Sequence, residues 1–417
     1  MRSILLTFLL LSSFLLEASS KYQTTIFHSN IKTLQIIPNE DKLLQPIIDL
    51  NTDDILNISF DELSHEAHSY GYKLVHCNSD WTPSDLMTTE YIDGYTTANI
   101  TDYTLSQSTT FLYTHYKFSL PNDEMKLKIS GNYVVLIYED NETDNPIAQT
   151  CFSVVEPKVS ISATVRGNTD TELNKRLQQI DFEVFLKGYN IRDISSELKV
   201  YVRQNNRVDN QVANIQPTYI SNSKLSYINN KDLIFEGGNE FYRFDISSVY
   251  AASEGIDAID YIQPHYEAFL SKNKIHNSSI YIHNLDVNGK FLINYQEAFD
   301  DSNYEADYMY VNFCLPTSKP FFTGQLYLGG EFNYNQFDET SRLKYDNENQ
   351  CYYQRILLKQ GGYNFQYRFV PKGSQKAFVE PVDGSYWETN NEYTIYVYQR
   401  PWGERYDKLI AVKDFNN

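Results

Sequence analysis

Two histidines and one acidic loop have the residue types and spacing that come nearest to a metal site. His65 and His68 lie three positions apart, which brings imidazoles together on a helix, but no H-E-x-x-H motif accompanies them. We therefore expect a solvated loop here in preference to a metal site. The stretch 284–289 reads N-L-D-V-N-G and imitates the start of a calcium loop, but its twelfth position is Tyr295, where a bidentate Glu is required. A hairpin turn with Gly289 at positive φ is the better prediction.

The sequence contains none of the motifs that mark common catalytic sites. It has no G-x-S-x-G nucleophile elbow, no phosphate-binding P-loop and no dinucleotide-binding fingerprint. The chain has 54 Asp and Glu residues, so any one carboxylate pair chosen from the sequence says little about acid–base catalysis. We therefore predict that the protein is not an enzyme and that it uses no cofactor and no metal.

The three tryptophans, Trp81, Trp387 and Trp402, are candidates for stacking on a sugar or a partner. Trp81 directly follows a strand-like run, so we expect it in a core or between modules. Trp402 lies between two strand-like runs and close to Arg405, and Trp and Arg dominate the hot spots of protein interfaces. Trp402 is therefore the better candidate for an exposed anchor.

Four cysteines, Cys77, Cys151, Cys314 and Cys351, allow two disulfides with three possible connectivities. None belongs to a C-x-x-C motif, which argues against zinc binding and thioredoxin-type chemistry. We expect pairs inside modules, Cys77 with Cys151 and Cys314 with Cys351. The alternative, that all four are small buried hydrophobic residues, stays equally open.

The elements that must position these residues are predominantly β-strands. Apolar and polar residues alternate with a period of two along most of the chain, and polar turn clusters separate the runs at hairpin spacing. Tyr (35 residues) and Phe (24 residues) are abundant, and aromatic residues favour sheets. Two weak helical patterns occur, at 171–178 and 258–270. We predict an all-β protein made of immunoglobulin-like or fibronectin-like β-sandwich modules.

The length of 417 residues suggests about three modules. One boundary is expected at Pro157, because proline interrupts the hydrogen bonding of a continuing strand. A second is expected at the polar run 300–303, before a new aromatic strand. We therefore predict three modules in series: an N-terminal sandwich over 21–156, a middle sandwich over 157–300 and a C-terminal immunoglobulin-like sandwich over 301–417.

The first 20 residues have the composition of a signal peptide. A positive residue, Arg2, precedes an apolar stretch at 4–16, and the small residues Ala18 and Ser20 stand before the expected cleavage site. No later run of about 18 apolar residues follows, so we expect no direct membrane insertion. The net charge of −19 argues against binding to nucleic acid, because an acidic surface repels phosphates.

Short phrases in all three predicted modules, taken in their order, resemble one protein family. The phrases of the first module are HCNSDW (76–81), YTHY (113–116), LPN (120–122) and SGNY (130–133). Those of the other two are VYVRQN (200–205), EGGNEF (236–241), ADY (306–308), GGY (361–363), ETNNEY (388–393) and YQRPWGERYD (398–407). Together they are similar to the plug protein family of the type IX secretion system, an exporter of Bacteroidota.

The resemblance implies a periplasmic protein at the inner face of the outer membrane. Such a protein binds the large outer-membrane translocon barrel of the secretion system and seals its pore when no cargo is in transit. The family has no assigned catalytic residues. The third module alone also resembles the glycogen-binding type of carbohydrate module, through 329–333 and 361–367. The alternative function is therefore an envelope glycan-binding protein.

Two loops are the candidate contacts with the barrel. The residues concerned are Gly237, Gly238, Asn239 and Glu240 in one loop and Trp402 and Arg405 in the other. Each loop is either a partner anchor or a brace between modules, and the sequence favours neither.

Overall fold

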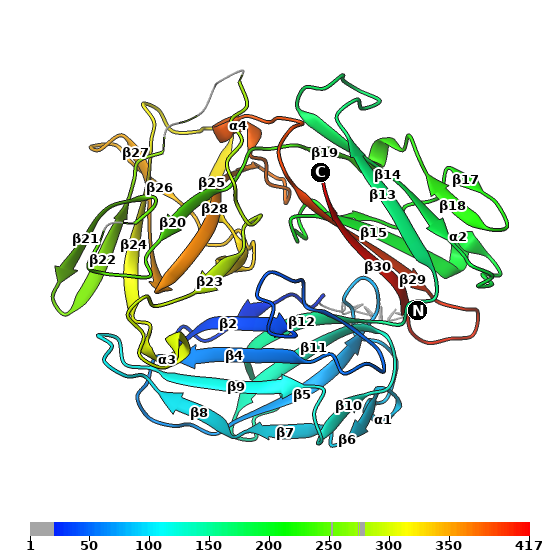
Figure 1. The fold of residues 1–417 in the computed structure, drawn as a ribbon, viewed down its shortest axis with the longest axis horizontal. Helices are drawn as coiled ribbons and strands as arrows, with labels where there is room; N and C mark the ends of the chain where they lie inside the picture. Colours follow the sequence, from blue (N-terminus) through cyan, green and yellow to red (C-terminus); the bar gives the residue numbers. More distant parts are fainter. Residues whose placement is uncertain (1–20, 252, 274, 276–279) are drawn as a thin grey trace, which may run out of the picture.

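The computed structural model describes residues 21–417 except 252, 274 and 276–279. Over these residues the chain forms thirty strands, and its four α-helices are single turns of four residues. The predicted all-β class is thereby confirmed. The strands form three β-sandwiches arranged around the centre of the molecule (Figure 1). The predicted signal peptide, 1–20, lies outside the described residues.

The first sandwich is drawn in blue and cyan in Figure 1 and has a core that includes Phe60, Tyr133 and Phe152. One sheet consists of β1 (Thr25–Ile26), β12 (Pro146–Val155), β11 (Gly131–Glu139), β5 (Tyr70–Cys77) and β7 (Thr97–Ile100), with β3 (Ile47–Asp49) paired to β12. The facing sheet consists of β2 (Ile31–Pro38), β4 (Leu56–Glu62), β9 (Thr114–Leu120) and β8 (Asp102–Leu105). The smaller elements are α1 (Thr88–Tyr91), β6 (Ile92–Gly94) and β10 (Met125–Leu127).

The second sandwich combines two distant parts of the chain around a core that includes Val200, Tyr227 and Ile395. One sheet consists of β13 (Ser160–Arg166), β14 (Leu177–Phe185), β18 (Lys224–Tyr227) and β17 (Tyr219–Ile220), with β19 (Ile234–Glu236) paired to β14. The other consists of β16 (Val212–Ala213), β15 (Leu198–Gln204), β29 (Glu392–Gln399) and β30 (Lys408–Asn416). The helical turns are α2 (Ile194–Glu197) and η1 (Lys231–Leu233).

The third sandwich has a core that includes Phe313, Leu328 and Phe365. One sheet consists of β20 (Tyr242–Asp245), β28 (Gly361–Pro371) and β23 (Phe291–Ile293), with β25 (Gly324–Gly329) paired to β28. The other consists of β21 (Ile256–Ile262), β22 (His265–Leu270), β24 (Tyr308–Pro316), β27 (Cys351–Lys359) and β26 (Lys344–Asp346). The helical turns are α3 (Ser302–Glu305), η2 (Glu331–Asn333) and α4 (Glu380–Asp383).

The third sandwich is inserted between the two parts of the second, so the predicted boundary between 300 and 301 is wrong. The strands β20, β22 and β23 precede residue 301 but pair with β28 or β24, which follow it. Strands β29 and β30 lie near the end of the chain but complete the second sandwich through β15. The polar run 300–303 is a helix start and not a linker, since the Asp301 carboxylate accepts a 2.8 Å hydrogen bond from Asn303 N. The modules are therefore not arranged in series.

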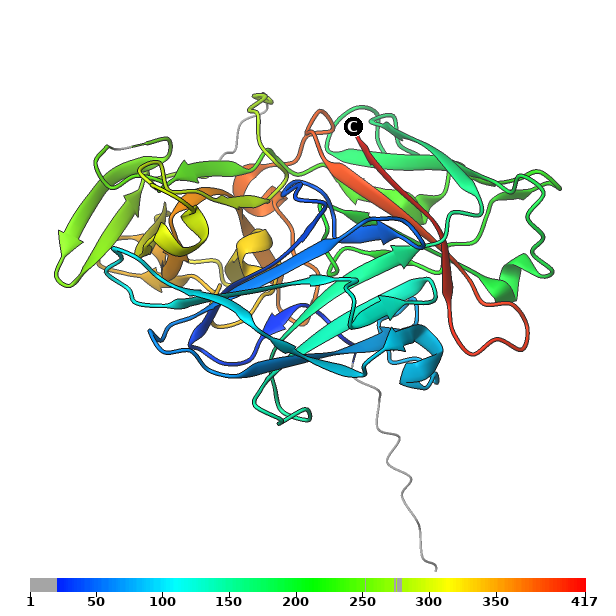
Figure 2. The same cartoon turned by 60° about the horizontal axis from the view of Figure 1, so that its bottom comes forward.

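The weak helical pattern at 258–270 is also wrong. These residues belong to β21 and β22, an antiparallel hairpin that projects from the third sandwich in Figure 2. Ala268 and Leu270 are buried in the core, and β22 pairs with β24. The second weak pattern, 171–178, covers a loop and the first two residues of β14. Pairing with a neighbouring sheet overrides local preference at such positions.

Candidate functional site

The first and third sandwiches meet at a buried ion pair. The Lys359 ammonium lies 2.5 Å from Asp61 Oδ2, and each side chain is 1% exposed. His115 Nδ1 lies 2.7 Å from Asp61 Oδ1, and the Tyr308 hydroxyl donates to Asp61 Oδ2 at 2.6 Å. Burial raises the pKa of Asp61, but Lys359 and His115 outweigh it and hold that pKa below its usual value. We call this contact the Asp61 seam.

The same seam joins two of the phrases found in the sequence. Asp307, which directly precedes β24, accepts hydrogen bonds from the backbone N–H groups of Thr110 (2.7 Å) and Phe111 (3.0 Å). The Tyr113 hydroxyl donates to the carbonyl of Ala306 at 2.7 Å. The phrases at 113–116 and 306–308 are therefore packed against each other across the seam.

The first and second sandwiches meet at Asp407, whose side chain is fully buried. Its carboxylate accepts from Ser79 N (2.9 Å), Lys199 Nζ (3.0 Å) and Arg400 Nε (2.8 Å). Burial raises the pKa of Asp407, but the hydrogen bonds from Ser79 and Lys199 outweigh burial and lower it below its usual value. Arg400 also donates to the side chain of Asn78 at 2.5 Å. This Asp407 seam joins the phrases 76–81 and 398–407.

The second and third sandwiches meet at the loop 237–240, which connects β19 to β20. The Asn391 side chain donates to the carbonyl of Gly237 at 2.7 Å, and the Thr389 hydroxyl donates to the carbonyl of Gly238 at 2.8 Å. Asn239 donates from its side chain to the carbonyl of Asp383 at 3.0 Å. The loop is therefore held by both sandwiches, and we call this contact the Glu240 seam.

Glu240 gives this seam an acidic centre. It is 7% exposed, and its Oε1 accepts from Asn390 N at 3.2 Å and from the hydroxyl of Tyr281. The neighbouring Asp286 accepts from Phe241 N at 2.5 Å. Burial, with a further contribution from Glu240, raises the pKa of Asp286 to about 6. The structure therefore places the loop residues 237–240 inside a seam, with little surface left for a partner.

The loop 400–407, between β29 and β30, has a buried root and an exposed tip. Trp402 is 85% exposed. Arg405 is half-exposed, donates to the carbonyl of Asp85 at 2.9 Å and forms an ion pair with Glu90 of the first sandwich. Figure 2 shows this red loop projecting beside the first sandwich. Arg405 thus braces the Asp407 seam, whereas Trp402 is free to contact a partner.

The other candidate residues take structural positions. His68 Nδ1 lies 2.8 Å from Glu62 Oε1, and His65 Nε2 lies 3.1 Å from the carbonyl of Ser106. The stretch 284–289 ends in a turn, with φ of 53° at Asn288 and the predicted positive φ, 90°, at Gly289. The predicted hairpin is wrong, because 281–287 form no strand and β23, which follows the turn, pairs with β28. Among the described residues, no group of three His, Cys, Asp or Glu side chains is placed to hold a metal ion.

All four cysteines are free thiols, so the predicted disulfides are not formed. Cys77 lies on β5 and Cys151 on β12, and β11 separates the two strands. Two strand spacings amount to about 9.5 Å, beyond the reach of a disulfide. Cys314 and Cys351 are neighbours on β24 and β27, but they are offset in register, with Cys314 opposite Tyr353. Burial raises the pKa of the Cys151 thiol to about 12, so it stays protonated at neutral pH.

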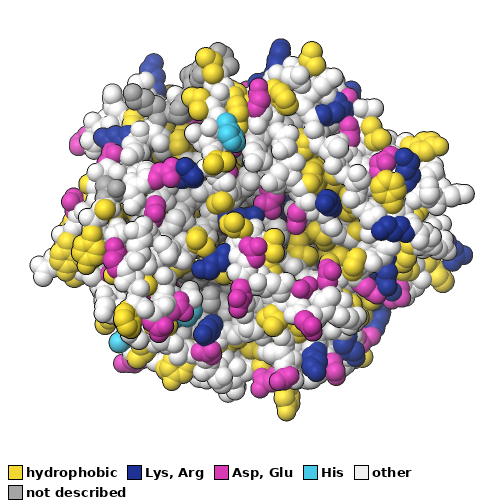
Figure 3. All heavy atoms as spheres, in the orientation of Figure 1, with side chains coloured by type: hydrophobic (Ala, Val, Ile, Leu, Met, Phe, Trp, Pro, Cys, Tyr) yellow, Lys and Arg dark blue, Asp and Glu magenta, His cyan; other side chains and the backbone are white. Residues whose placement is uncertain are grey.

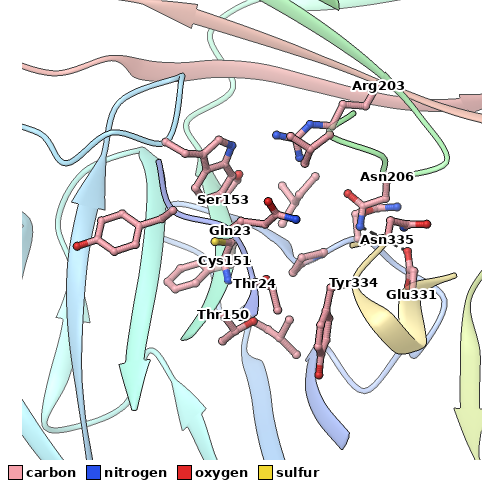
Figure 4. A pocket seen from close by; sticks show the side chains of 18 of the residues that line it. Gln23, Thr24, Thr150, Cys151, Ser153, Arg203, Asn206, Glu331, Tyr334 and Asn335 are labelled. Carbon is pink, nitrogen blue, oxygen red and sulfur yellow. Dashed lines mark hydrogen bonds between the residues drawn. The ribbon is translucent and has the colours of Figure 1, made fainter. Parts of the chain in front are cut away.

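A cavity of about 510 Å³ lies where the three sandwiches meet. Figure 4 shows Gln23 and Cys151 of the first sandwich on one side of it and Asn206 of the second and Asn335 of the third on the other. Arg203 lies 5.2 Å from the ring centre of Tyr396, which also lines the cavity. Sequence reasoning missed this cavity, because its lining comes from segments more than 300 residues apart.

Sequence reasoning also missed the Asp61 seam. Asp61 and Lys359 are almost 300 positions apart, and each stands in an ordinary strand pattern. The one available signal was the set of phrases that resemble a known family. Those phrases are concentrated at the seams, as the contacts of 76–81, 236–241 and 388–393 show.

The first sandwich decides the family. Residues 31–156 match a family model described as the first domain of the type 9 secretion system plug protein. The chain belongs to the type 9 secretion system plug protein family. Membership in this plug family assigns the protein a role associated with type 9 secretion and with the cell envelope.

The whole fold is similar to that of a solved structure from another bacterium. A hypothetical protein from Parabacteroides merdae superimposes with a TM-score of 0.93 and is 39% identical over 95% of this chain and 100% of that chain. None of the curated proteins compared with the chain matches it. Within the described residues, no helix combines the length and apolar character needed to span a membrane.

Proposed function

We propose that this plug-family protein binds the outer-membrane translocon barrel from the periplasmic side and closes its pore when no cargo is in transit. The way the three sandwiches are joined supports this proposal most directly. Every pair of sandwiches shares a seam of buried polar contacts, centred on Asp61, Asp407 or Glu240. Because these contacts are buried, we expect the three sandwiches to move as one body. A rigid body can close an opening by its shape, without turnover.

A reversible seal needs few strong anchors on an otherwise polar face. Trp402 is the proposed anchor, because it is exposed at the tip of a loop whose root is fixed by Asp407. Figure 3 shows Lys and Arg side chains intermixed with Asp and Glu over one face of the molecule, as in a polar interface rim. The net charge of −19 favours a basic contact surface on the barrel.

Affinity purification from detergent-solubilised envelope tests the partner. We expect the tagged chain to co-purify a large outer-membrane barrel protein of the secretion system, and we expect high salt to weaken the complex. Trp402→Ala is expected to reduce recovery of the barrel, whereas Phe322→Ala, at an exposed position on the third sandwich, serves as the matched control. Equal recovery with both variants would remove Trp402 from the interface.

Outer-membrane permeability tests the sealing role separately. A strain that lacks the gene is expected to admit large solutes through the translocon while cargo export continues. Expression of the wild-type chain is expected to restore the barrier, and Trp402→Ala is expected to restore it incompletely. Unchanged permeability in the deletion strain would contradict the sealing role even if the barrel co-purifies.

Glycan binding by the third sandwich is the second candidate function. The phrase 329–333 does not form an exposed aromatic platform, because Phe332 packs against Tyr363 in the core of that sandwich. One residue of the phrase, Glu331, does line the central cavity. Any glycan site is therefore expected at the junction of the sandwiches and not on the outer face of the third.

A further inference from the structure

The central cavity has the size and position of a small-molecule site. Its volume of about 510 Å³ falls within the range of roughly 300–1,000 Å³ typical of ligand pockets, which often lie between domains. Glu331, Tyr334 and Cys151 lie deep inside the molecule but keep accessible surface, because they face this space. A ligand held there would contact all three sandwiches at once.

Two aromatic residues on different walls have an unusual backbone. Trp81 of the first sandwich has φ of 67°, and Tyr334 of the third has φ of 56°. Bulky residues rarely adopt the left-handed region, and such conformations are concentrated at ligand sites. Arg203 of the second sandwich lies 5.9 Å from the ring centre of Trp81. The walls thus combine aromatic side chains with a planar guanidinium group.

Hydrogen-bonding groups without a partner surround the same space. Gln45 Oε1, Thr150 Oγ1 and Asn335 Oδ1 belong to lining residues and are buried without a hydrogen-bond partner. Buried polar groups of this kind are normally satisfied by the protein, by ordered water or by a ligand. The Asn206 side chain makes a long hydrogen bond of 3.4 Å to Glu331 Oε1. The cavity therefore suits a ligand with many hydroxyl groups.

The charges on the walls favour an uncharged ligand. Among the described residues, the lining contains two acidic residues, Asp80 and Glu331, and four basic ones, of which Lys21 and Lys42 are exposed to solvent and Lys199 and Arg203 are not. Lys199 is already paired with Asp407, and Arg203 donates to Gln211 Oε1 at 2.6 Å. Lys199 and Arg203 are thus already engaged with protein side chains, which favours a ligand that binds through hydroxyl groups over one that binds through charge.

We propose that the central cavity binds a short, uncharged saccharide. The flat apolar faces of sugar rings suit Trp81 and Tyr334, and sugar hydroxyls suit Glu331, Asn206 and Asn335. This site is separate from the exposed Trp402 tip, so the proposal does not depend on the plug function.

Calorimetric titration of the purified full chain tests the site, with N,N′-diacetylchitobiose, cellobiose and maltose as probes and trialanine as the peptide comparison. We expect at least one disaccharide to bind at a single site and to quench Trp81 fluorescence. Asn335→Gly keeps the left-handed backbone at φ 52° but removes the amide, so it should weaken binding about three- to tenfold. Glu331→Gln is expected to weaken binding similarly.

Trp402→Ala is the matched control, because Trp402 lies outside the cavity lining. It should leave disaccharide binding unchanged while it weakens barrel binding, so the two proposals fail independently. Melting curves establish that each variant is folded before titration. Binding of trialanine in place of the disaccharides, no binding of any disaccharide at millimolar concentration, or binding that Asn335→Gly leaves unchanged would overturn the proposal.

Discussion

The loops 237–240 and 400–407 were indistinguishable as candidate anchors but lie in opposite environments. The first loop is enclosed between two sandwiches, and Glu240 is 7% exposed. The second has a root as buried as the first, at Asp407, but a tip at Trp402 that is 85% exposed. In this protein the polar, glycine-containing loop 237–240 therefore lies in a close junction between two sandwiches. In the loop 400–407, the exposed aromatic side chain of Trp402 is the part available to a partner.

The largest effect is expected when the buried root of the 400–407 loop is removed. Asp407→Ala leaves Lys199 and Arg400 without their carboxylate and deletes the bond to Ser79, at a cost of about 3 kcal/mol in the free energy of unfolding. Urea unfolding measures the change. Glu404→Ala, which removes a more exposed pair with Lys408, is the control and should cost under about 1 kcal/mol. Similar urea midpoints for the two variants would mean that the contacts of Asp407 do not stabilise the junction between the first and second sandwiches.

The next effect concerns close packing in the 237–240 loop. A Cβ atom on Gly237 would lie 2.1 Å from the carbonyl oxygen of Tyr386 and 2.9 Å from that of Arg176. Gly237→Ala must move the backbone, and we expect a loss of about 1–3 kcal/mol in thermal or urea unfolding. Gly362→Ala is the matched control, since a Cβ atom there meets nothing within 4 Å. A Gly237→Ala variant as stable as the control would show that the two sandwiches are not in close contact here.

The two loops should also respond to pH with opposite signs. Asp407 has a lowered pKa, so its stabilisation is present above about pH 4, the unfolded value, and is lost as the pH falls further. Asp286, beside the 237–240 loop, has a pKa raised to about 6, so stability decreases as the pH rises from about 4 to 6. Asp286→Asn is expected to flatten the stability profile between about pH 4 and 6. An unchanged slope in that variant, measured by urea midpoints, would contradict the assignment.

The smallest effect on stability is expected at the tip. Trp402→Ala removes an exposed side chain and should change the free energy of unfolding by less than about 0.5 kcal/mol. The same change should weaken barrel binding about thirtyfold, as expected for a hot-spot tryptophan. Binding to the purified barrel, measured by surface plasmon resonance, gives the comparison. If Trp402→Ala lowered the free energy of unfolding but left barrel binding unchanged, Trp402 would be a structural residue and not a partner anchor.

The fold class and many strands were predictable because their signal is local. Alternation along β4 and turn residues such as Asn288-Gly289 depend on near neighbours in sequence. The resemblance to the plug family was predictable because phrases such as 76–81 and 398–407 occur in a specific order. The prediction of a helix at 258–270 is wrong, because a short apolar pattern fits a helix or a strand equally until the neighbouring strands are known.

The sequence alone determined that the chain is an all-β protein of the plug family. Only the tertiary structure decided that β29 and β30 return to β15, that the 237–240 loop is enclosed and that a cavity lies at the centre. The physical reason is that these contacts join residues far apart in the sequence. The pairing of β15 with β29 joins residues about 200 positions apart, and the Asp61–Lys359 ion pair joins residues almost 300 positions apart. The local sequence around a carboxylate that is buried in a seam does not differ from that around an exposed one. Burial of a carboxylate depends on which distant segment of the chain packs against it.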